Sequence, residues 1–243
     1  EDVVFPDVPI LSDCPDAGDT LVYVLGSKRE LYSFYPPTLA FKSIGTIACP
    51  TSANPNSMAV TRSGIAFTNF LSGELFEIST ANAACKATPY DAGQQGWSTY
   101  GMGYAGIPDG GETLYVSGFS KQGLAMIDTS SFTLDPIAQY QPVEQFSCEL
   151  TGTGDGHLYA FCPFGTGAWF HEIDPVTAQL ISSHQLSTGG SLVSWAFAFW
   201  GGDFWLFTNS NVTKYDPITQ VETTVTQAPI EVVGAGVSTC APL

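Results

Sequence analysis

The sequence predicts an all-β fold, a five-bladed β-propeller built from four-stranded antiparallel blades. The main observation is a repeat: residues 170–177 (FHEIDPVT) have the pattern of a strand followed by a tight turn, and residues 212–219 (VTKYDPIT) repeat it. Looser copies put turn-opening residues at positions 35, 79 and 128, so five units recur every 42 to 49 residues, as propeller blades do. Composition agrees, because 44% apolar and 12% charged residues with 25 Gly and 16 Pro are typical of short strands joined by tight turns.

Each unit is expected to be a meander of strands whose first hairpin turns on glycine and aspartate. Residues 1–18 form an extended lead-in without periodicity. The predicted strands are 20–25, 30–35 and 39–47; 56–61, 65–69, 74–79 and 85–89; 100–105, 113–117, 123–128 and 134–140; 146–151, 157–161, 168–174 and 180–186; and 195–200, 204–208, 211–216 and 221–226. The chain 1–243 is thus predicted to be one domain, with blades at about 19–49 plus 230–240, 50–92, 93–141, 142–188 and 189–228.

The first unit is one strand short, and the end of the chain supplies the missing strand. Residues 232–238 (VVGAGVS) match the opening strands of other units, such as 100–105 (YGMGYA). We therefore expect the C-terminal strand to become the innermost strand of the first blade. Closing the ring in this way removes open sheet edges, which otherwise invite aggregation.

Six cysteines without a Cys-x-x-Cys pair indicate disulfides formed in an oxidising compartment. Cys14 and Cys240 flank the expected ring closure, and a bridge between them would replace the missing covalent turn. Cys148 and Cys162 flank a Gly-Asp-Gly turn on neighbouring strands. Elimination then leaves Cys49 to pair with Cys85. No metal site is predicted from these thiols.

The charge pattern excludes some partners. A net charge of −16, from 23 acidic and 7 basic residues, repels phosphate backbones and anionic lipids. Nucleic acid is therefore not an expected partner. No apolar run approaches the length of a transmembrane segment. We also expect the protein to be a monomer. The even number of cysteines predicts an extracellular or periplasmic protein. The chain begins at Glu1 without a Met or a signal peptide, which we interpret as the removal of an N-terminal segment that could have carried a lipid anchor.

One carboxylate breaks the pattern of the inner strands. When the five innermost strands are aligned, one alignment position near the axis holds small residues in four strands and a glutamate in the fifth. The residues at this position are Ala59, Gly103, Glu149, Ala198 and Gly236. A carboxylate at a narrow axis needs water, a cation or a hydrogen-bond donor, because an isolated buried charge is costly. Glu149 is therefore either a solvated tunnel residue or a contact for a ligand or cation.

The residues just before these strands should rim one mouth of the tunnel. That column is Asn56, Tyr100, Phe146, Trp195 and Val233, and nearby loops add amides and carboxylates that include Gln94 and Gln95. Aromatic faces beside such groups suit a sugar ring, although the aromatics could instead plug the axis. The predicted ligand-binding residues are Glu149, Trp195, Tyr100, Phe146, Asn56, Trp97 and Gln145.

Signals for catalysis are weak. The histidines His157, His171 and His184 fall on different strands without a shared register, so no metal site, triad or other cofactor site is expected. Glycoside hydrolysis ordinarily needs two carboxylates, and Glu149 would have to recruit Glu144 or Glu231. The recurring turn aspartates are expected only to cap their turns.

Residues 32–39 (YSFYPPTL), 93–97 (GQQGW) and 149–155 (ELTGTGD) resemble a family of secreted or lipid-anchored bacterial β-propeller proteins of uncharacterised function. The resemblance covers roughly residues 12–240 and implies export but no activity. A weaker similarity to five-bladed propeller lectins lacks their repeated binding motif, which favours one asymmetric central site.

Three functional hypotheses follow from the sequence. The leading one is an extracellular binding module that holds a carbohydrate or another small polar ligand at the tunnel mouth. The second is a scaffold or adhesion protein that acts through its acidic surface, and the third is a glycoside hydrolase that uses Glu149.

Overall fold

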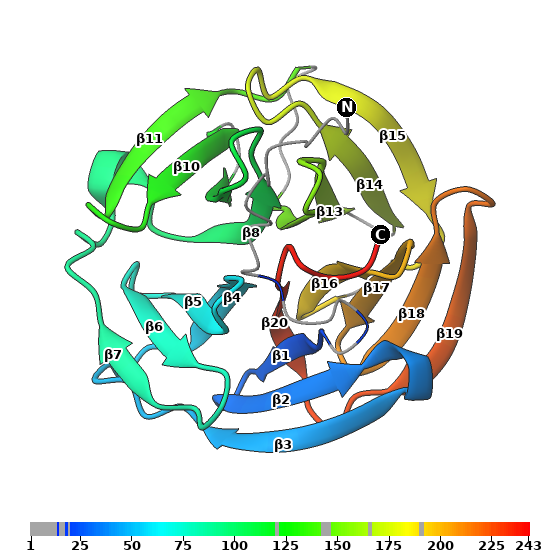
Figure 1. Ribbon diagram of the computed structural model, residues 1–243, viewed down its shortest axis with the longest axis horizontal. Helices are drawn as coiled ribbons and strands as arrows, with labels where there is room; N and C mark the ends of the chain where they lie inside the picture. The colour runs from blue at the N-terminus through cyan, green and yellow to red at the C-terminus, as the bar shows by residue number, and fades with distance from the viewer. Residues whose placement is uncertain are drawn as a thin grey trace, which may run out of the picture.

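The computed structural model describes residues 14, 18, 20–119, 122–141, 147–164, 167–189 and 192–243. Within these residues the chain forms five four-stranded antiparallel sheets arranged in a ring around a central axis (Figure 1). Apart from two short 3₁₀ helices, η2 (Pro36–Thr38) and η3 (Gln94–Gly96), every regular element of the described residues is a strand. The predicted five-bladed propeller is confirmed.

The blades follow one another along the chain, and each runs from an inner to an outer strand. Blades two to five use strands in sequence order: β4 (Pro55–Val60), β5 (Ile65–Phe70), β6 (Leu75–Ser79) and β7 (Cys85–Ala87); β8 (Tyr100–Gly106), β9 (Glu112–Gly118), β10 (Leu124–Asp128) and β11 (Thr133–Ala138); β12 (Glu149–Gly152), β13 (Leu158–Phe164), β14 (Gly167–Ile173) and β15 (Leu180–Leu186); and β16 (Trp195–Trp200), β17 (Asp203–Thr208), β18 (Asn211–Asp216) and β19 (Val221–Gln227).

Blade one combines the two ends of the chain, as predicted. Its order is β20 (Val232–Val237), β1 (Val22–Gly26), β2 (Glu30–Tyr35) and β3 (Ala40–Thr46). The innermost pair is antiparallel, with Val22 opposite Val237. A disulfide between Cys14 and Cys240 ties the two ends of this pair together, and Cys49–Cys85 and Cys148–Cys162 also form. All three predicted disulfides are confirmed.

Small residues allow the inner strands of adjacent blades to meet backbone to backbone. A Cβ atom on Gly101 of β8 would lie 2.0 Å from the carbonyl oxygen of Cys148, and one on Gly103 would lie 2.6 Å from the carbonyl of Leu150. Any larger side chain there would push blades three and four apart. The space between the sheets is filled by apolar clusters, with aromatic residues such as Phe34, Phe204 and Tyr215 fully buried.

The recurring turns that revealed the repeat are local capping structures. Oδ1 of Asp174 accepts hydrogen bonds from the backbone N–H groups of Val176 at 2.8 Å and Thr177 at 3.2 Å, and Asp216 binds Ile218 and Thr219 in the same way. The backbone bonds hold the pKa of Asp174 below its ordinary value. The pKa of Asp216 is lowered first by the Thr219 hydroxyl and then by the two backbone N–H groups. The capping role predicted for these aspartates is confirmed.

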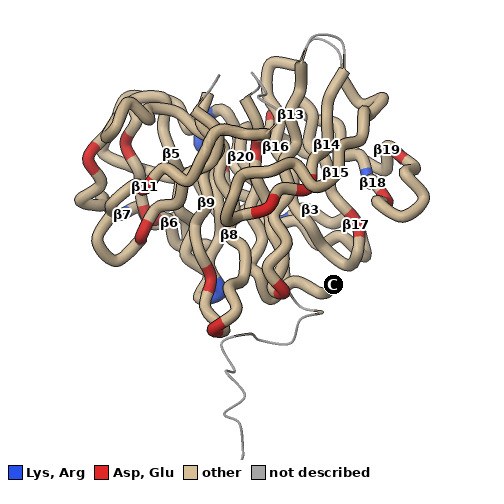
Figure 2. The backbone as a smooth tube through the Cα atoms, turned by 90° about the horizontal axis from the view of Figure 1, so that it is seen from above, with Lys and Arg blue, Asp and Glu red and all other residues tan. Residues whose placement is uncertain are grey.

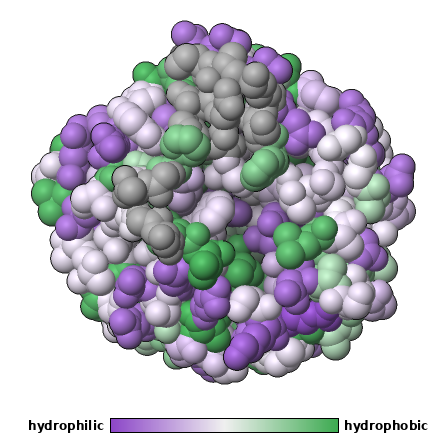
Figure 3. Space-filling model, turned by 180° about the vertical axis from the view of Figure 1, so that it is seen from behind, coloured by the Kyte–Doolittle hydropathy of each residue, from purple (hydrophilic) through white to green (hydrophobic). Residues whose placement is uncertain are grey.

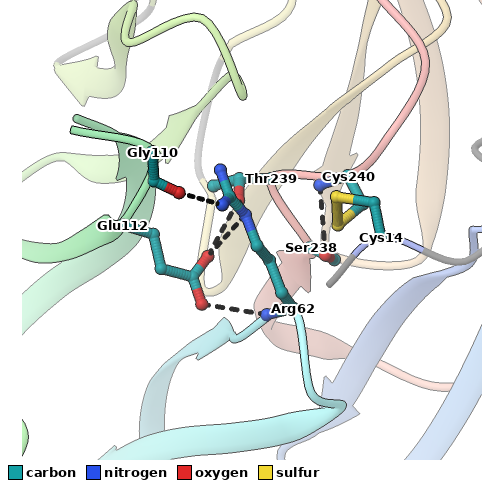
Figure 4. Close-up of a disulfide and its surroundings, with 7 residues drawn as sticks. All are labelled: Cys14, Arg62, Gly110, Glu112, Ser238, Thr239 and Cys240. Carbon is teal, nitrogen blue, oxygen red and sulfur yellow. Dashed lines mark hydrogen bonds and ion pairs between the residues drawn. A yellow bond between two sulfur atoms is a disulfide. The ribbon is translucent and has the colours of Figure 1, made fainter. Parts of the chain in front are cut away.

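The face that carries the C-terminus is cross-linked by one arginine (Figure 4). The Arg62 guanidinium donates to the carbonyl of Gly110 at 2.6 Å and to the hydroxyl of Thr239 at 2.7 Å. Thr239 in turn donates to Glu112 at 2.8 Å. This cluster joins blades two and three to the segment that follows β20, beside the Cys14–Cys240 disulfide.

Candidate functional site

A cavity of about 340 Å³ opens on the face opposite the C-terminus, where the chain enters the inner strands. Figure 3 shows this face, with hydrophobic side chains gathered beside a central hollow. Its lining combines one carboxylate, a few polar groups and a larger set of apolar side chains: Pro55, Asn56, Leu71, Thr99, Tyr100, Phe119, Ser147, Glu149, Val193, Ser194, Trp195 and Val233. This mouth is the one that the sequence predicted.

Glu149 is the only charged residue on the five innermost strands, whose described sequences are PNSMAV, YGMGYAG, ELTG, WAFAFW and VVGAGV. It is 6% exposed. The fully buried hydroxyl of Ser57 on β4 donates a hydrogen bond to its Oε2 at 2.6 Å, and the same hydroxyl accepts from the backbone N–H of Met102 on β8 at 3.0 Å. One serine therefore connects blades two, three and four below the cavity.

Glu149 lies nearer the mouth than the alignment predicted. A Cβ atom on Gly101 would come within 2.7 Å of the Glu149 Cα, whereas one on Gly103 would approach Thr151. Along the central axis, Glu149 thus lies at the height of Ser57 and Gly101. The sequence alignment had placed it two residues further from the mouth, at the height of Ala59 and Gly103. The predicted alignment is wrong at this strand, and the shift places the carboxylate in the wall of the cavity.

Burial raises the pKa of Glu149 well above its ordinary value, while the Ser57 hydroxyl and the Met102 backbone N–H oppose the rise. Burial prevails because desolvation of a carboxylate is costly and no cationic side chain among the described residues lines the cavity. The group therefore favours its neutral form until a donor or a positive charge compensates the carboxylate.

Two more polar side chains present hydrogen-bonding capacity to the cavity. Asn56 donates through Nδ2 to the Tyr100 carbonyl at 3.0 Å and to Asn69 at 3.3 Å, so its orientation is fixed, and its Oδ1 accepts no bond from the described residues. The Ser194 hydroxyl is buried and has no hydrogen-bond partner in the described part of the chain. Buried polar groups are normally paired, so Ser194 is suited to bind a group that enters the cavity.

Apolar side chains form the outer part of the mouth. Leu71, Phe119 and Val193 are 57%, 62% and 76% exposed, and Trp195 is half-buried beside them in the lining. They come from the β5–β6 and β9–β10 loops and from the segment that leads into β16. Of these four residues, Trp195 belongs to the predicted ligand-binding set, and the structure adds Leu71, Phe119 and Val193.

Two predicted ligand-binding aromatics lie in the core. Trp97 and Tyr100 are only 3% and 2% exposed and belong to the apolar cluster between blades two and three. Tyr100 borders the cavity, but its ring packs beside Tyr90, with 6.4 Å between ring centroids. Tyr100 thus lines the cavity as an almost fully buried residue, whereas Trp97 is not among the lining residues.

The amides expected at the mouth explain why Trp97 is buried. Gln94 donates through Nε2 to the Phe132 carbonyl at 3.0 Å and accepts from the Leu134 N–H at 2.8 Å, and Gln95 donates to the Leu134 carbonyl at 2.5 Å. These bonds fasten η3 to the outer hairpin of blade three. The following Trp97 is thereby directed inward against Gly118.

The remaining predicted residues are either not described or lie elsewhere. Phe146 and Gln145, with Glu144, fall outside the described residues. Glu231 lines a separate cavity beside Lys28 and Glu30. The lining of the candidate site therefore contains Glu149, Asn56, Trp195 and Tyr100 from the predicted set, with Ser194 and the apolar rim added by the structure.

The histidines do not join this site. His171 is buried and shares a hydrogen bond of 2.8 Å with Ser183, and burial lowers its pKa to about 4. His157 is exposed and pairs with Glu172 at 2.8 Å. Across the described residues, no group of three or more His, Cys, Asp or Glu side chains is arranged to hold a metal ion.

Comparisons with known proteins bear on the fold. No family model matches the chain, and no curated protein matches it. Among solved structures, a protein of unknown function from Bacteroides thetaiotaomicron covers 86% of this chain with a TM-score of 0.53 and 11% identity. An auxiliary nutrient binding protein from the same species covers 84% with a TM-score of 0.52 and 11% identity.

The likeness is one of fold alone. Identity of 11% supports no shared activity, and the matches cover only 60% and 53% of those two longer chains. In the segments that the structure describes, no helix is both long enough and apolar enough to span a membrane. Function must therefore be argued from the cavity.

Proposed function

We propose that this protein is a binding module that holds a small ligand, such as a glycan or another molecule with a polar head group, in the cavity beside Glu149. One observation carries the proposal: a buried carboxyl group and an unpaired buried hydroxyl, Ser194, line the same cavity below an apolar rim. Cavities of this volume, mostly apolar with a few convergent polar groups, are typical of small-molecule sites.

The proposed setting is outside the cytoplasm, in the extracellular space or the periplasm. Three disulfides among six cysteines support this setting, because such bonds persist in oxidising compartments. A role in nutrient capture is compatible with the propeller from Bacteroides thetaiotaomicron, an auxiliary nutrient binding protein. Whether the chain is free or attached to a lipid does not affect the proposed site.

Binding is favoured over hydrolysis by the number of carboxylates. Glu149 is the single acidic residue among the described lining residues, whereas ordinary glycoside hydrolysis uses a pair. A second candidate function, adhesion through the outer surface, is favoured by the net charge of −16 and by the acidic residues, red along the backbone in Figure 2, that are distributed around the blades.

A ligand screen followed by two variants tests the proposed function. Glycan arrays and thermal-shift screening of small polar compounds should yield a binder whose affinity falls at least tenfold in Trp195→Ala. The control is Ile218→Ala, because Ile218 is an apolar residue that is 90% exposed on a turn away from the cavity; its affinity should be unchanged. Failure to find any binder, or equal affinity in all three proteins, would favour adhesion instead.

A further inference from the structure

The charge of the ligand can be inferred from the lining of the cavity, on the condition that the proposed function holds. Glu149 is the single ionisable acid or base among the described lining residues apart from the Tyr100 phenol, and that phenol lies in the core beside Tyr90. No described lysine, arginine or histidine borders the space. From the described residues, an anionic head group would therefore meet a carboxyl group and no compensating cation.

The two arginines are committed elsewhere. Arg29 donates to the carbonyl oxygens of Thr51 and Ala53 at 2.5 and 2.7 Å and lies over the Phe70 ring at 5.6 Å. Arg62 is held on the opposite face by Gly110 and Thr239. Neither lines the cavity, so neither is positioned to neutralise an anion there.

Glu149 and Asn56 present hydrogen-bond acceptors to the cavity, and the hydroxyl-bearing lining residues Thr99, Ser147 and Ser194 can accept as well as donate. Ser57 occupies one site on Oε2 of Glu149, but a carboxylate accepts about four hydrogen bonds, so capacity remains. Asn56 turns its donor nitrogen toward the Tyr100 carbonyl, which leaves Oδ1 as an acceptor, and the unpaired Ser194 hydroxyl can also accept. A primary ammonium group carries three N–H donors and no acceptor, which matches this set.

The rim favours an organic cation over a metal ion. Hard cations such as Ca²⁺ take six to eight oxygen ligands, whereas here one carboxylate is surrounded by Leu71, Phe119, Val193 and Trp195. The face of a tryptophan attracts ammonium groups and packs against apolar carbon. The net charge of −16 also raises the local concentration of cations near the surface.

We propose that the cavity binds an organic amine in its ammonium form, with the charged nitrogen against the Glu149 carboxylate and an apolar body against Trp195 and Phe119. Amines of this class include aromatic and alkyl monoamines. The carboxyl proton leaves to solvent when the ammonium binds, and no covalent bond changes.

Binding should therefore depend on pH through Glu149. The strands that pack around β12 are β4, β8, β9, β13 and β16. Their one charged residue is Glu112 at the start of β9, which accepts hydrogen bonds from Arg62 and Thr239 on the opposite face. Their other titratable side chains are the tyrosines Tyr100, Tyr104, Tyr115 and Tyr159 and the disulfide-bonded Cys162. Burial keeps the phenol pKa values above their ordinary range. Amine binding is therefore coupled to the ionisation of Glu149, and amine affinity should rise with pH, by up to tenfold per unit, until this carboxyl group is ionised.

Isothermal titration with matched probes tests the proposal: 2-phenylethylamine, 2-phenylethanol and 3-phenylpropanoate, which differ in head-group charge. The amine should bind at least tenfold more tightly than the alcohol, and the carboxylate should not bind. Titrations in two buffers with different ionisation enthalpies should show proton release. In Glu149→Gln the preference for the amine should disappear, and in Ile218→Ala it should persist; CaCl₂ alone serves as the metal probe.

The outcomes separate this inference from the proposed function. Equal binding of alcohol and amine, or preference for the carboxylate, with dependence on Trp195, would overturn the ammonium assignment and leave the binding function intact. Saturable binding of Ca²⁺ that competes with the amine would replace the organic cation by a metal. A cavity that binds none of the probes and no compound from the wider screen would overturn both proposals.

Discussion

The Ser57 hydroxyl donates a hydrogen bond to Oε2 of Glu149 at 2.6 Å although the residues are 92 positions apart and lie in blades that are not neighbours. The same oxygen accepts from the Met102 N–H of the intervening blade. A single small side chain thus coordinates three blades at the floor of the cavity. It stabilises the ring and also modulates the carboxyl group that we propose as the ligand contact.

Replacing this hydroxyl should destabilise the fold. Ser57→Ala leaves the Met102 N–H and the Glu149 carboxyl without their buried partner, and an unsatisfied buried polar group costs about 1–3 kcal/mol. The free energy of unfolding from guanidinium denaturation should fall by that amount. The control is Ser63→Ala, which removes an exposed hydroxyl bonded only to Thr61 and should change it by less than about 0.5 kcal/mol. Equal stability of both variants would contradict the bridging role.

The Glu149 carboxyl should make stability decline as pH rises. Its folded pKa is raised above the ordinary 4.5, so the folded protein retains a proton that the unfolded chain loses, and the free energy of unfolding falls as pH rises through 4.5 toward the folded pKa. Glu149→Gln removes this dependence. Denaturation of both proteins from about pH 4 to 8 should show the variant gaining relative stability with increasing pH; a constant difference would contradict the assignment.

His171 should produce the opposite dependence. Burial lowers its pKa from 6.5 to about 4, so the unfolded chain takes up a proton that the folded protein excludes, and stability is lost as pH falls from 6.5 toward 4. The upper bound of this loss is about 3 kcal/mol. In His171→Gln the loss should be smaller, whereas His157→Gln, which alters an exposed histidine, should retain it. An acid sensitivity that survives in His171→Gln would place its origin elsewhere.

The disulfides should differ in their contribution to stability. In the chain-entropy model, Cys14–Cys240, which spans 226 residues, contributes about 5 kcal/mol, and Cys148–Cys162, which spans 14, contributes about 3 kcal/mol. Paired Cys→Ser replacement should therefore lower the denaturation midpoint more for the first bridge. The reverse order would show that ring closure rests on strand pairing more than on the covalent link.

The fold was predictable because it repeats. The Asp174 and Asp216 turns follow a pattern that any blade needs, and the disulfides follow from which strands the repeat places side by side. One recurring feature of the backbone was not predicted. The residue four positions after each turn opening has a left-handed conformation, with φ between 56° and 59°, and these five residues are Leu39, Ala83, Phe132, Ala178 and Gln220. None of them is a glycine, the residue type that usually marks this conformation. Residue type gave no signal of that conformation.

The candidate site was only partly predictable, because it depends on departures from the repeat. Glu149 was identified as the exceptional residue, but residue size could not fix its height along the central axis. Thr151, and not Glu149, lies opposite Gly103, and a threonine is small enough to stand among the alanines and glycines there. Tyr100 and Trp97 were expected at the mouth because aromatic residues precede an inner strand. Tyr100 does border the cavity. For Trp97, tertiary contacts decide otherwise: Gln94 and Gln95 bond to the outer hairpin of the same blade, and the tryptophan turns inward.

The order in which the blades can be completed follows from the composition of blade one. Because Val22 pairs with Val237, the edge of β1 stays bare until almost the whole chain has been synthesised. Blades two to five, whose strands are consecutive, can form as they emerge. We therefore expect the blade that is made first to be finished last, and a chain truncated before residue 232 should expose a strand edge that seeks partners in other molecules.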